Sequence, residues 1–195
     1  MASTLSSEVI FVFFLTAFIV CAFLVVIVRR YALKQLLDHP NARSSHLIPT
    51  PRGGGLAIAI VFHAGVVGLW WLAVLPTAVS LALLGGGILI AAVGWVDDHR
   101  HVPAGVRVSV HFIAASWAVY CLGGITQLNL GSFFLPLPGI GSILAVIGIV
   151  WLTNLYNFMD GIDGIAGGQG MAVALMGGAL LGLAGAATAR RRQGK

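Results

Sequence analysis

Six long apolar runs follow one another along the chain. They cover residues 9–28, 56–75, 78–96, 106–122, 140–155 and 165–187. At about 1.5 Å of rise per helical residue, runs of this length suit helices that cross the hydrocarbon core of a bilayer. The pattern predicts an all-α, multi-pass transmembrane bundle of about six spans. Residues 1–195 are expected to form a single integral membrane domain, with no separate soluble domain.

Polar or glycine-rich stretches separate the runs. In the longest, residues 29–53, prolines at 40, 49 and 51 forbid a continuous helix. Two shorter polar stretches cover residues 97–105 and 156–164. Residues 123–139 carry no charge, and their β-branched and aromatic residues, together with Gly and Pro, predict a short hairpin.

The composition supports the same fold class. Hydrophobic residues make up 58% of the chain, the mean hydropathy is +0.98 and only 9% of residues are charged, against about 25% in an average soluble domain. A soluble core of this size could not hide so much apolar surface. Cys21 and Cys121 stand alone in apolar surroundings, so we interpret them as small hydrophobic residues rather than as a disulfide or a metal pair.

The net charge of +5 comes from basic residues that gather in loops. Membrane proteins keep such loops in the cytoplasm, so this charge predicts no nucleic-acid partner. The same rule places the N-terminus outside and the stretches 29–53, 97–105 and 156–164 in the cytoplasm. Six crossings would leave the C-terminus outside, yet residues 190–195 hold four basic side chains. Either the last apolar run does not cross, or the chain is a shortened version of a longer one.

Carboxylates are scarce in this sequence, with six in the whole chain. Asp97 and Asp98 are adjacent at the end of one apolar run. Asp160 and Asp163 follow another in the stretch NLYNFMDGIDG, together with Asn154 and Asn157. Carboxylates near hydrocarbon are costly and usually mark function.

Each acidic cluster has a functional and a structural interpretation. Asp97 and Asp98 suit a metal-linked or acid–base pair at a phosphate site, or simply a polar loop that ends a span. The oxygen donors of the second cluster, spaced by three residues, suit Mg²⁺, which binds one or two carboxylates together with substrate phosphates. The alternative there is a helix-terminating turn, which would not explain the two amides upstream.

The first polar stretch combines basic side chains with three consecutive glycines, in the order PTPRGGG. Arg43, His46 and Arg52 suit polyanion binding, because arginine offers paired donors to phosphate. The alternative is an ordinary cytoplasmic basic loop, which explains the charge but not the glycine order. Arg107 lies beside the Asp97–Asp98 stretch and is a further candidate for phosphate binding.

Three ordered motifs carry a resemblance to a known family. The segments HPNARSSHLIPTPRGGG, GWVDDHRHVPAGVRVSVHF and NLYNFMDGIDG are similar to those of the polyprenyl-phosphate sugar-1-phosphate transferases, glycosyltransferase family 4. That family includes the peptidoglycan translocase and the enzymes that initiate O-antigen and enterobacterial common antigen synthesis. The form RSSH…PTPRGGG most resembles the O-antigen branch.

The resemblance implies a reaction. Such enzymes transfer a sugar-1-phosphate from a UDP-sugar to undecaprenyl phosphate, in the bacterial inner membrane and on its cytoplasmic face, and release UMP. The expected cofactor is Mg²⁺, and the products serve lipopolysaccharide and cell-wall synthesis. Either direct attack by the lipid phosphate or a covalent aspartyl intermediate is compatible with the sequence.

By motif match, the resemblance also assigns roles to residues. Asp97 and Asp98 are the catalytic acids near the lipid phosphate, one of them a base. Asn157 and Asp160 match the metal region. The residues expected to contact substrate are Arg43, His46, Arg52, Arg107, Asn154 and Asp163.

The sequence departs from the family pattern after Ala166. Family members have about ten spans, and their later half carries a further metal-binding Asp and a basic loop that helps to hold the nucleotide sugar. We therefore expect this chain to match the N-terminal portion of the family, and its partner to be either the missing C-terminal half or a second copy. Two other hypotheses are an inactive or partner-dependent fragment and a small membrane transporter, which would carry its acids in mid-span.

Overall fold

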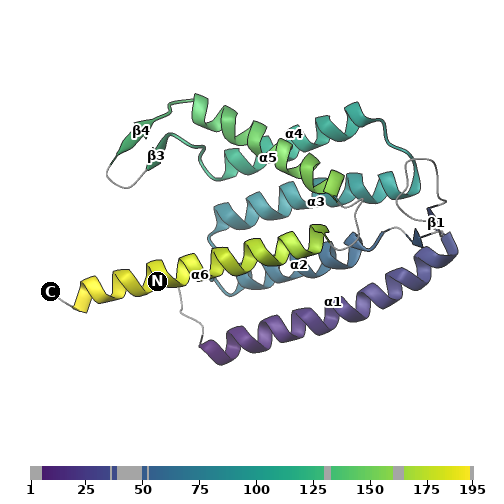
Figure 1. The fold of residues 1–195 in the computed structure, drawn as a ribbon, viewed down its shortest axis with the longest axis horizontal. Helices are drawn as coiled ribbons and strands as arrows, with labels where there is room; N and C mark the ends of the chain where they lie inside the picture. Colours follow the sequence, from purple (N-terminus) through teal and green to yellow (C-terminus); the bar gives the residue numbers. More distant parts are fainter. Residues whose placement is uncertain are drawn as a thin grey trace. The chain divides into compact units, whose positions relative to one another are not determined.

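The computed structural model describes residues 6–35, 37–38, 50–51, 53–129, 133–159 and 165–193, and it is mostly helical (Figure 1). Its helices are α1 (Ser7–Gln35), α2 (Gly55–Trp71), α3 (Thr77–His99), α4 (Ala104–Cys121), α5 (Ile140–Met159) and α6 (Ile165–Gln193). The chain divides into two compact units, Met1–Thr153 and Asn154–Lys195. The second unit holds the last turns of α5 and all of α6.

Four helices within the described ranges are long and apolar enough to cross a membrane, judged by length and composition. They are Glu8–Lys34, Thr77–His99, Ala104–Cys121 and Ile140–Met159. Two further apolar helical segments, Gly55–Trp71 and Gly167–Leu183, are shorter. The predicted fold class, a helical membrane bundle, is therefore confirmed.

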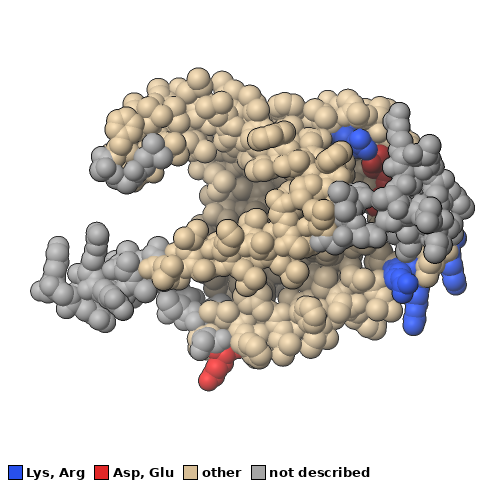
Figure 2. Space-filling view, viewed as in Figure 1, with Lys and Arg blue, Asp and Glu red and all other residues tan. Residues whose placement is uncertain are grey.

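The outer surface of these helices is apolar. Phe18 is 72% exposed, Trp71 86% and Leu181 76%, which is the reverse of a soluble protein and is expected where lipid is the solvent. On the face drawn in Figure 2, the described Lys and Arg side chains gather at one end of the first unit. The described basic side chains therefore lie together at one end of a largely apolar surface.

Helix α2 ends at Trp71, four residues before the predicted limit of 75. The N–H of Ala73 donates to the carbonyl of Trp70 (2.9 Å), and the N–H of Val74 donates to that of Leu69 (2.9 Å). This pair of bonds is a Schellman motif, and Ala73 has the left-handed φ of 53° that the motif requires. Alanine rarely adopts this conformation, so the early end of α2 could not be predicted from the sequence.

Helix α1 runs through Arg29 and Arg30 to Gln35, further than the predicted span of 9–28. Two short strands follow it, β1 (Leu37–Asp38) and β2 (Thr50–Pro51), which pair antiparallel. The pairing brings the start and the end of the first polar stretch together beside α1.

A hairpin lies between α4 and α5, as predicted for residues 123–139. Strands β3 (Gln127–Asn129) and β4 (Phe134–Pro136) pair antiparallel, with Leu128 opposite Leu135. Its base is fixed to α5, because the N–H of Ile125 donates to the hydroxyl of Ser142 (3.1 Å) and Gly141 lies directly against the carbonyl of Ile125. The hairpin therefore emerges from the ends of two membrane-length helices.

Helix α3 is the centre of the first unit, with α2 packed on one side and α4 on the other. Three consecutive glycines make this possible, because each admits a neighbour where a side chain would stand. A Cβ on Gly87 would lie 2.6 Å from Nε2 of His63 in α2, and one on Gly86 would lie 3.3 Å from the carbonyl oxygen of Ala114 in α4. The indole of Trp117 covers Gly85 and donates from Nε1 to the carbonyl of Leu81 (2.8 Å).

We predict that Gly85→Ala destabilises the protein by about 1–3 kcal/mol, because the new methyl group would overlap the Trp117 indole, which its hydrogen bond holds in place. The thermal unfolding midpoint in detergent measures the effect. Gly94→Ala, in the same helix, is the matched control: among the described residues nothing lies within 4 Å of its added Cβ, so we expect a gain of up to about 1 kcal/mol from helix propensity. Equal loss in both variants would contradict the packing argument.

Candidate functional site

Asp97 and Asp98 occupy the last turn of α3, which ends at His99. A short loop then leads to α4, so the acidic pair lies at the boundary between an apolar helix and polar chain. Asp97 accepts two hydrogen bonds. The N–H of Val102 donates to its Oδ1 (2.9 Å), and Nη1 of Arg107 donates to its Oδ2 (2.7 Å).

These two bonds give Asp97 a structural task. One oxygen holds the loop through the N–H of Val102, and the other forms an ion pair with Arg107 in the first turns of α4. Both side chains of the ion pair are partly exposed, Asp97 at 26% and Arg107 at 33%. The ion pair compensates the charge of Asp97 beside the apolar segment. Asp97 thereby fixes the direction of the α3 end and the position of its neighbour, Asp98.

An aromatic cluster beside the acidic pair was missed by the sequence reasoning. Nδ1 of His99 lies 2.8 Å from the carbonyl oxygen of Trp95. Because that oxygen can only accept, Nδ1 carries a proton, and in the neutral ring Nε2 accepts from the hydroxyl of Tyr31 in α1 (3.4 Å). The rings of Trp95 and His99 are 4.2 Å apart. The cluster ties the end of α1 to the end of α3 that carries Asp98.

The second predicted cluster begins at the C-terminal end of α5. Asn154 is half-buried and Asn157 is exposed, three positions apart and so on neighbouring parts of one helix face. The helix ends at Met159, and its terminal carbonyl groups make this the negative end of the helix dipole, which favours a cation. These two residues belong to the second compact unit, whereas Asp97, Asp98 and Arg107 belong to the first.

Five predicted site residues lie outside the described residues. They are Arg43, His46, Arg52, Asp160 and Asp163. Within the described part of the chain, no three His, Cys, Asp or Glu side chains come together as a metal cluster. Mg²⁺ does not need such a cluster, because it usually combines one or two protein oxygens with substrate phosphates and water. The oxygen donor of Asn157, at a negative helix end, fits that requirement.

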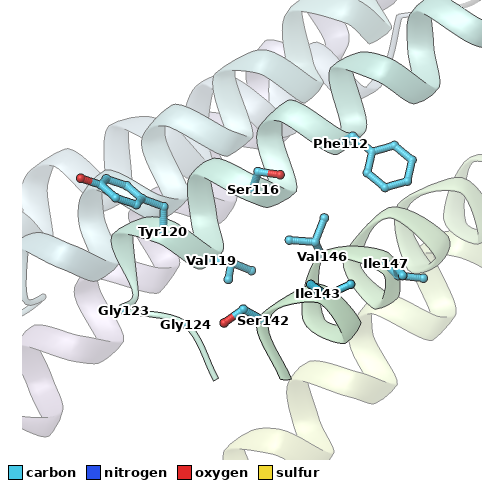
Figure 3. Close-up of a pocket in the computed structure, with 10 residues that line it drawn as sticks. All are labelled: Phe112, Ser116, Val119, Tyr120, Gly123, Gly124, Ser142, Ile143, Val146 and Ile147. Atoms are coloured by element: carbon cyan, nitrogen blue, oxygen red, sulfur yellow. The ribbon is translucent and has the colours of Figure 1, made fainter. Parts of the chain in front are cut away.

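A cavity of about 770 Å³ lies between α4 and α5 (Figure 3). It is lined by Phe112, Ser116, Val119, Tyr120, Gly123, Gly124, Ser142, Ile143, Val146 and Ile147. The lining carries no charge. Along α4, at 1.5 Å per residue, it extends from Phe112, about 7.5 Å from Arg107, to Tyr120, about 20 Å from Arg107.

Comparison with known families decides the relationship. The model of the family described as glycosyl transferase family 4 matches residues 80–190, more than half of the chain. The chain belongs to glycosyl transferase family 4. Comparisons with curated proteins and with solved structures gave no match.

Membership of glycosyl transferase family 4 confirms the resemblance to polyprenyl-phosphate sugar-1-phosphate transferases. It supports transfer of a sugar phosphate to a polyprenyl phosphate and, with the apolar helices, a membrane protein. The matched range includes both acidic clusters and Arg107. The basic residues Arg43, His46 and Arg52 precede it, so their assignment rests on the sequence motif alone.

We predict that Asp97 and Arg107 are energetically coupled. In a double-mutant cycle with Asp97→Asn and Arg107→Gln, the coupling free energy of unfolding should be about 0.5–1 kcal/mol, since the pair is partly exposed. Chemical unfolding in detergent measures it. The matched cycle replaces Arg107→Gln by Arg100→Gln, which removes the same charge from the residue that follows α3, and should give a coupling near zero. Equal coupling in both cycles would contradict the specific ion pair.

Proposed function

We propose that the chain transfers a sugar-1-phosphate from a UDP-sugar to undecaprenyl phosphate and releases UMP. The reaction takes place at the cytoplasmic face of the bacterial inner membrane, in the synthesis of cell-envelope polysaccharides. One observation carries the proposal: within the family-matched region, an arginine and a backbone N–H hold Asp97 so that Asp98 stands at the polar end of a membrane-length helix. A lipid-linked phosphate and a water-soluble nucleotide meet at that depth.

The chemistry is a phosphoryl transfer in which atoms balance. An oxygen of the lipid phosphate forms a bond to the β-phosphorus of the UDP-sugar. The bond between that phosphorus and the oxygen bridging to the α-phosphorus breaks, and UMP leaves with the electron pair. In a single-step reaction, a proton on the lipid phosphate passes to a base.

Asp98 is the residue that we assign as this base. Both carboxylate oxygens of Asp97 already accept hydrogen bonds, so Asp97 is a positioning residue. A guanidinium has five N–H donors, and Arg107 gives one of its Nη1 donors to Asp97. Its remaining donors suit the oxygens of a phosphate.

Mg²⁺, when bound, neutralises charge on the diphosphate and on the leaving UMP. Asn157 and Asp160 would hold it, since amide and carboxylate oxygens are the donors that this ion prefers. The proposed substrate contacts are Asn154, Asp163, Arg43, His46 and Arg52. The end of the α5 helix dipole adds a negative potential that favours the cation.

The transporter hypothesis is not favoured. A proton or metal pathway through the bilayer needs ionisable groups in mid-span. Asp97 and Asp98 instead lie in the final turn of α3, and Arg107 neutralises the first of them.

We predict UMP release when the chain, in lipid nanodiscs with undecaprenyl phosphate and Mg²⁺, receives the correct UDP-sugar from a panel. Parallel samples contain the C-terminal half of a longer family member, which tests the expected partner. Under whichever condition supports turnover, Asp98→Asn and Asp160→Asn should reduce UMP release by at least about 100-fold and leave membrane insertion unchanged.

The matched control is Glu8→Gln, which removes a carboxylate from the first turn of α1 and should leave turnover unchanged. Wild-type turnover in Asp98→Asn would remove that residue from the mechanism. Absence of UMP release from every sugar in both kinds of sample would overturn the proposed function.

A further inference from the structure

The β3–β4 hairpin presents two different faces. Side chains alternate along each strand, so the cross-strand pair Leu128 and Leu135 lies on one face, while Gln127 and Asn129 lie on the other, opposite Pro136 and Phe134. Both strands are exposed along their whole length, with Leu128 at 44% and Leu135 at 39%. One face is therefore apolar and has no covering element among the described residues of the first unit.

The position of the hairpin indicates which solvent surrounds its leucine face. It connects α4 and α5, which are both long and apolar enough to span a membrane, so it lies at the depth where spans end. Short connections make α2, α3 and α4 run alternately up and down, which brings the ends of α2 and α4 to the same side. Exposed aromatic residues mark that side, with Trp71 in the last turn of α2 and Tyr120 in the last turn of α4. Trp and Tyr are enriched at this level of membrane proteins.

The hairpin cannot be held to the membrane by electrostatic attraction to lipid headgroups. Residues 123–139 include no Asp, Glu, Lys or Arg, so the hairpin offers nothing to an anionic headgroup by Coulomb attraction. Its base borders the apolar cavity through Gly123, Gly124 and Ser142 (Figure 3). Neither the cavity lining nor the leucine face carries a charged side chain.

We propose that the hairpin is a membrane-interface anchor, with Leu128 and Leu135 facing the acyl chains and Gln127 facing water. The occupant of the apolar face is the bilayer itself, at the boundary between headgroups and hydrocarbon. Burial of two leucine side chains there stabilises the ends of α4 and α5 at a fixed depth. This inference concerns the end of the bundle away from Asp97 and does not depend on the proposed reaction.

Site-directed spin labelling of the full chain tests the anchor. Cys21 and Cys121 are replaced by serine, and single variants Leu128→Cys, Leu135→Cys and Gln127→Cys carry a nitroxide in vesicles of phosphatidylethanolamine and phosphatidylglycerol. Leu128 and Gln127 are neighbours on opposite faces, so they form a matched pair in which only the direction of the label differs. Thermal unfolding midpoints close to that of the cysteine-free parent select variants that keep the fold.

We expect labels at 128 and 135 to collide several-fold more often with oxygen, which dissolves in the bilayer, than with a water-soluble nickel chelate. The label at 127 should show the opposite preference. Replacing phosphatidylglycerol by phosphatidylcholine should change neither result, because the hairpin is uncharged. Three results would overturn the anchor: nickel access at 128 and 135, protection of both from oxygen and nickel by another part of the chain, or spin–spin broadening from a second copy.

Discussion

The first unit depends on the close approach of two helices to the glycine triplet of α3. Gly85 and Gly86 admit Trp117 and the Ala114 carbonyl of α4, while Gly87 admits His63 of α2. In lipid, the hydrophobic effect does not drive apolar helices together, so packing contacts and interhelical hydrogen bonds must do so. The Trp117 indole supplies one such bond at 2.8 Å to a carbonyl of α3. A side chain at any of the three glycines would separate α3 from a neighbour and weaken the unit.

That central helix also ends in the acidic pair, Asp97 and Asp98. Because α3 is held on two sides, its last turn is fixed in direction, and Asp97 then fastens the following loop through Val102 and Arg107. The Tyr31–His99 contact brings the end of α1 to the same place. A phosphoryl transfer gains most from groups that are already in position before the substrate arrives. The packing of α3 against its two neighbours therefore supports the fixed position of the loop that follows α3.

The sequence predicted what local chemistry determines. Long apolar runs gave the helices, and the uncharged stretch with Gly, Pro and aromatic residues gave the hairpin. It did not predict the end of α2, because Ala73 takes a left-handed conformation that only its surroundings enforce. Nor did it predict that Asp97 holds the loop, since its partners Val102 and Arg107 lie across that loop. The Tyr31–His99 contact joins residues 68 positions apart, and no periodicity in either helix predicts it. The contact between Trp95 and His99 is different, because their spacing of four residues places them on the same face of α3.

The two ends of the first unit differ in the charge that they carry. At one end, Asp97 and Arg107 compensate each other beside apolar chain, and basic side chains of α1 lie on the same side (Figure 2). At the other end, residues 123–139 carry no charge, so their contacts with the surroundings involve no charged side chain. In the proposed function the first end meets water-soluble substrate, and in the proposed anchor the leucine face of the other end meets acyl chains. The same α4 helix joins these two environments, and its length of 18 residues, about 27 Å, is close to the thickness of the hydrocarbon that separates them.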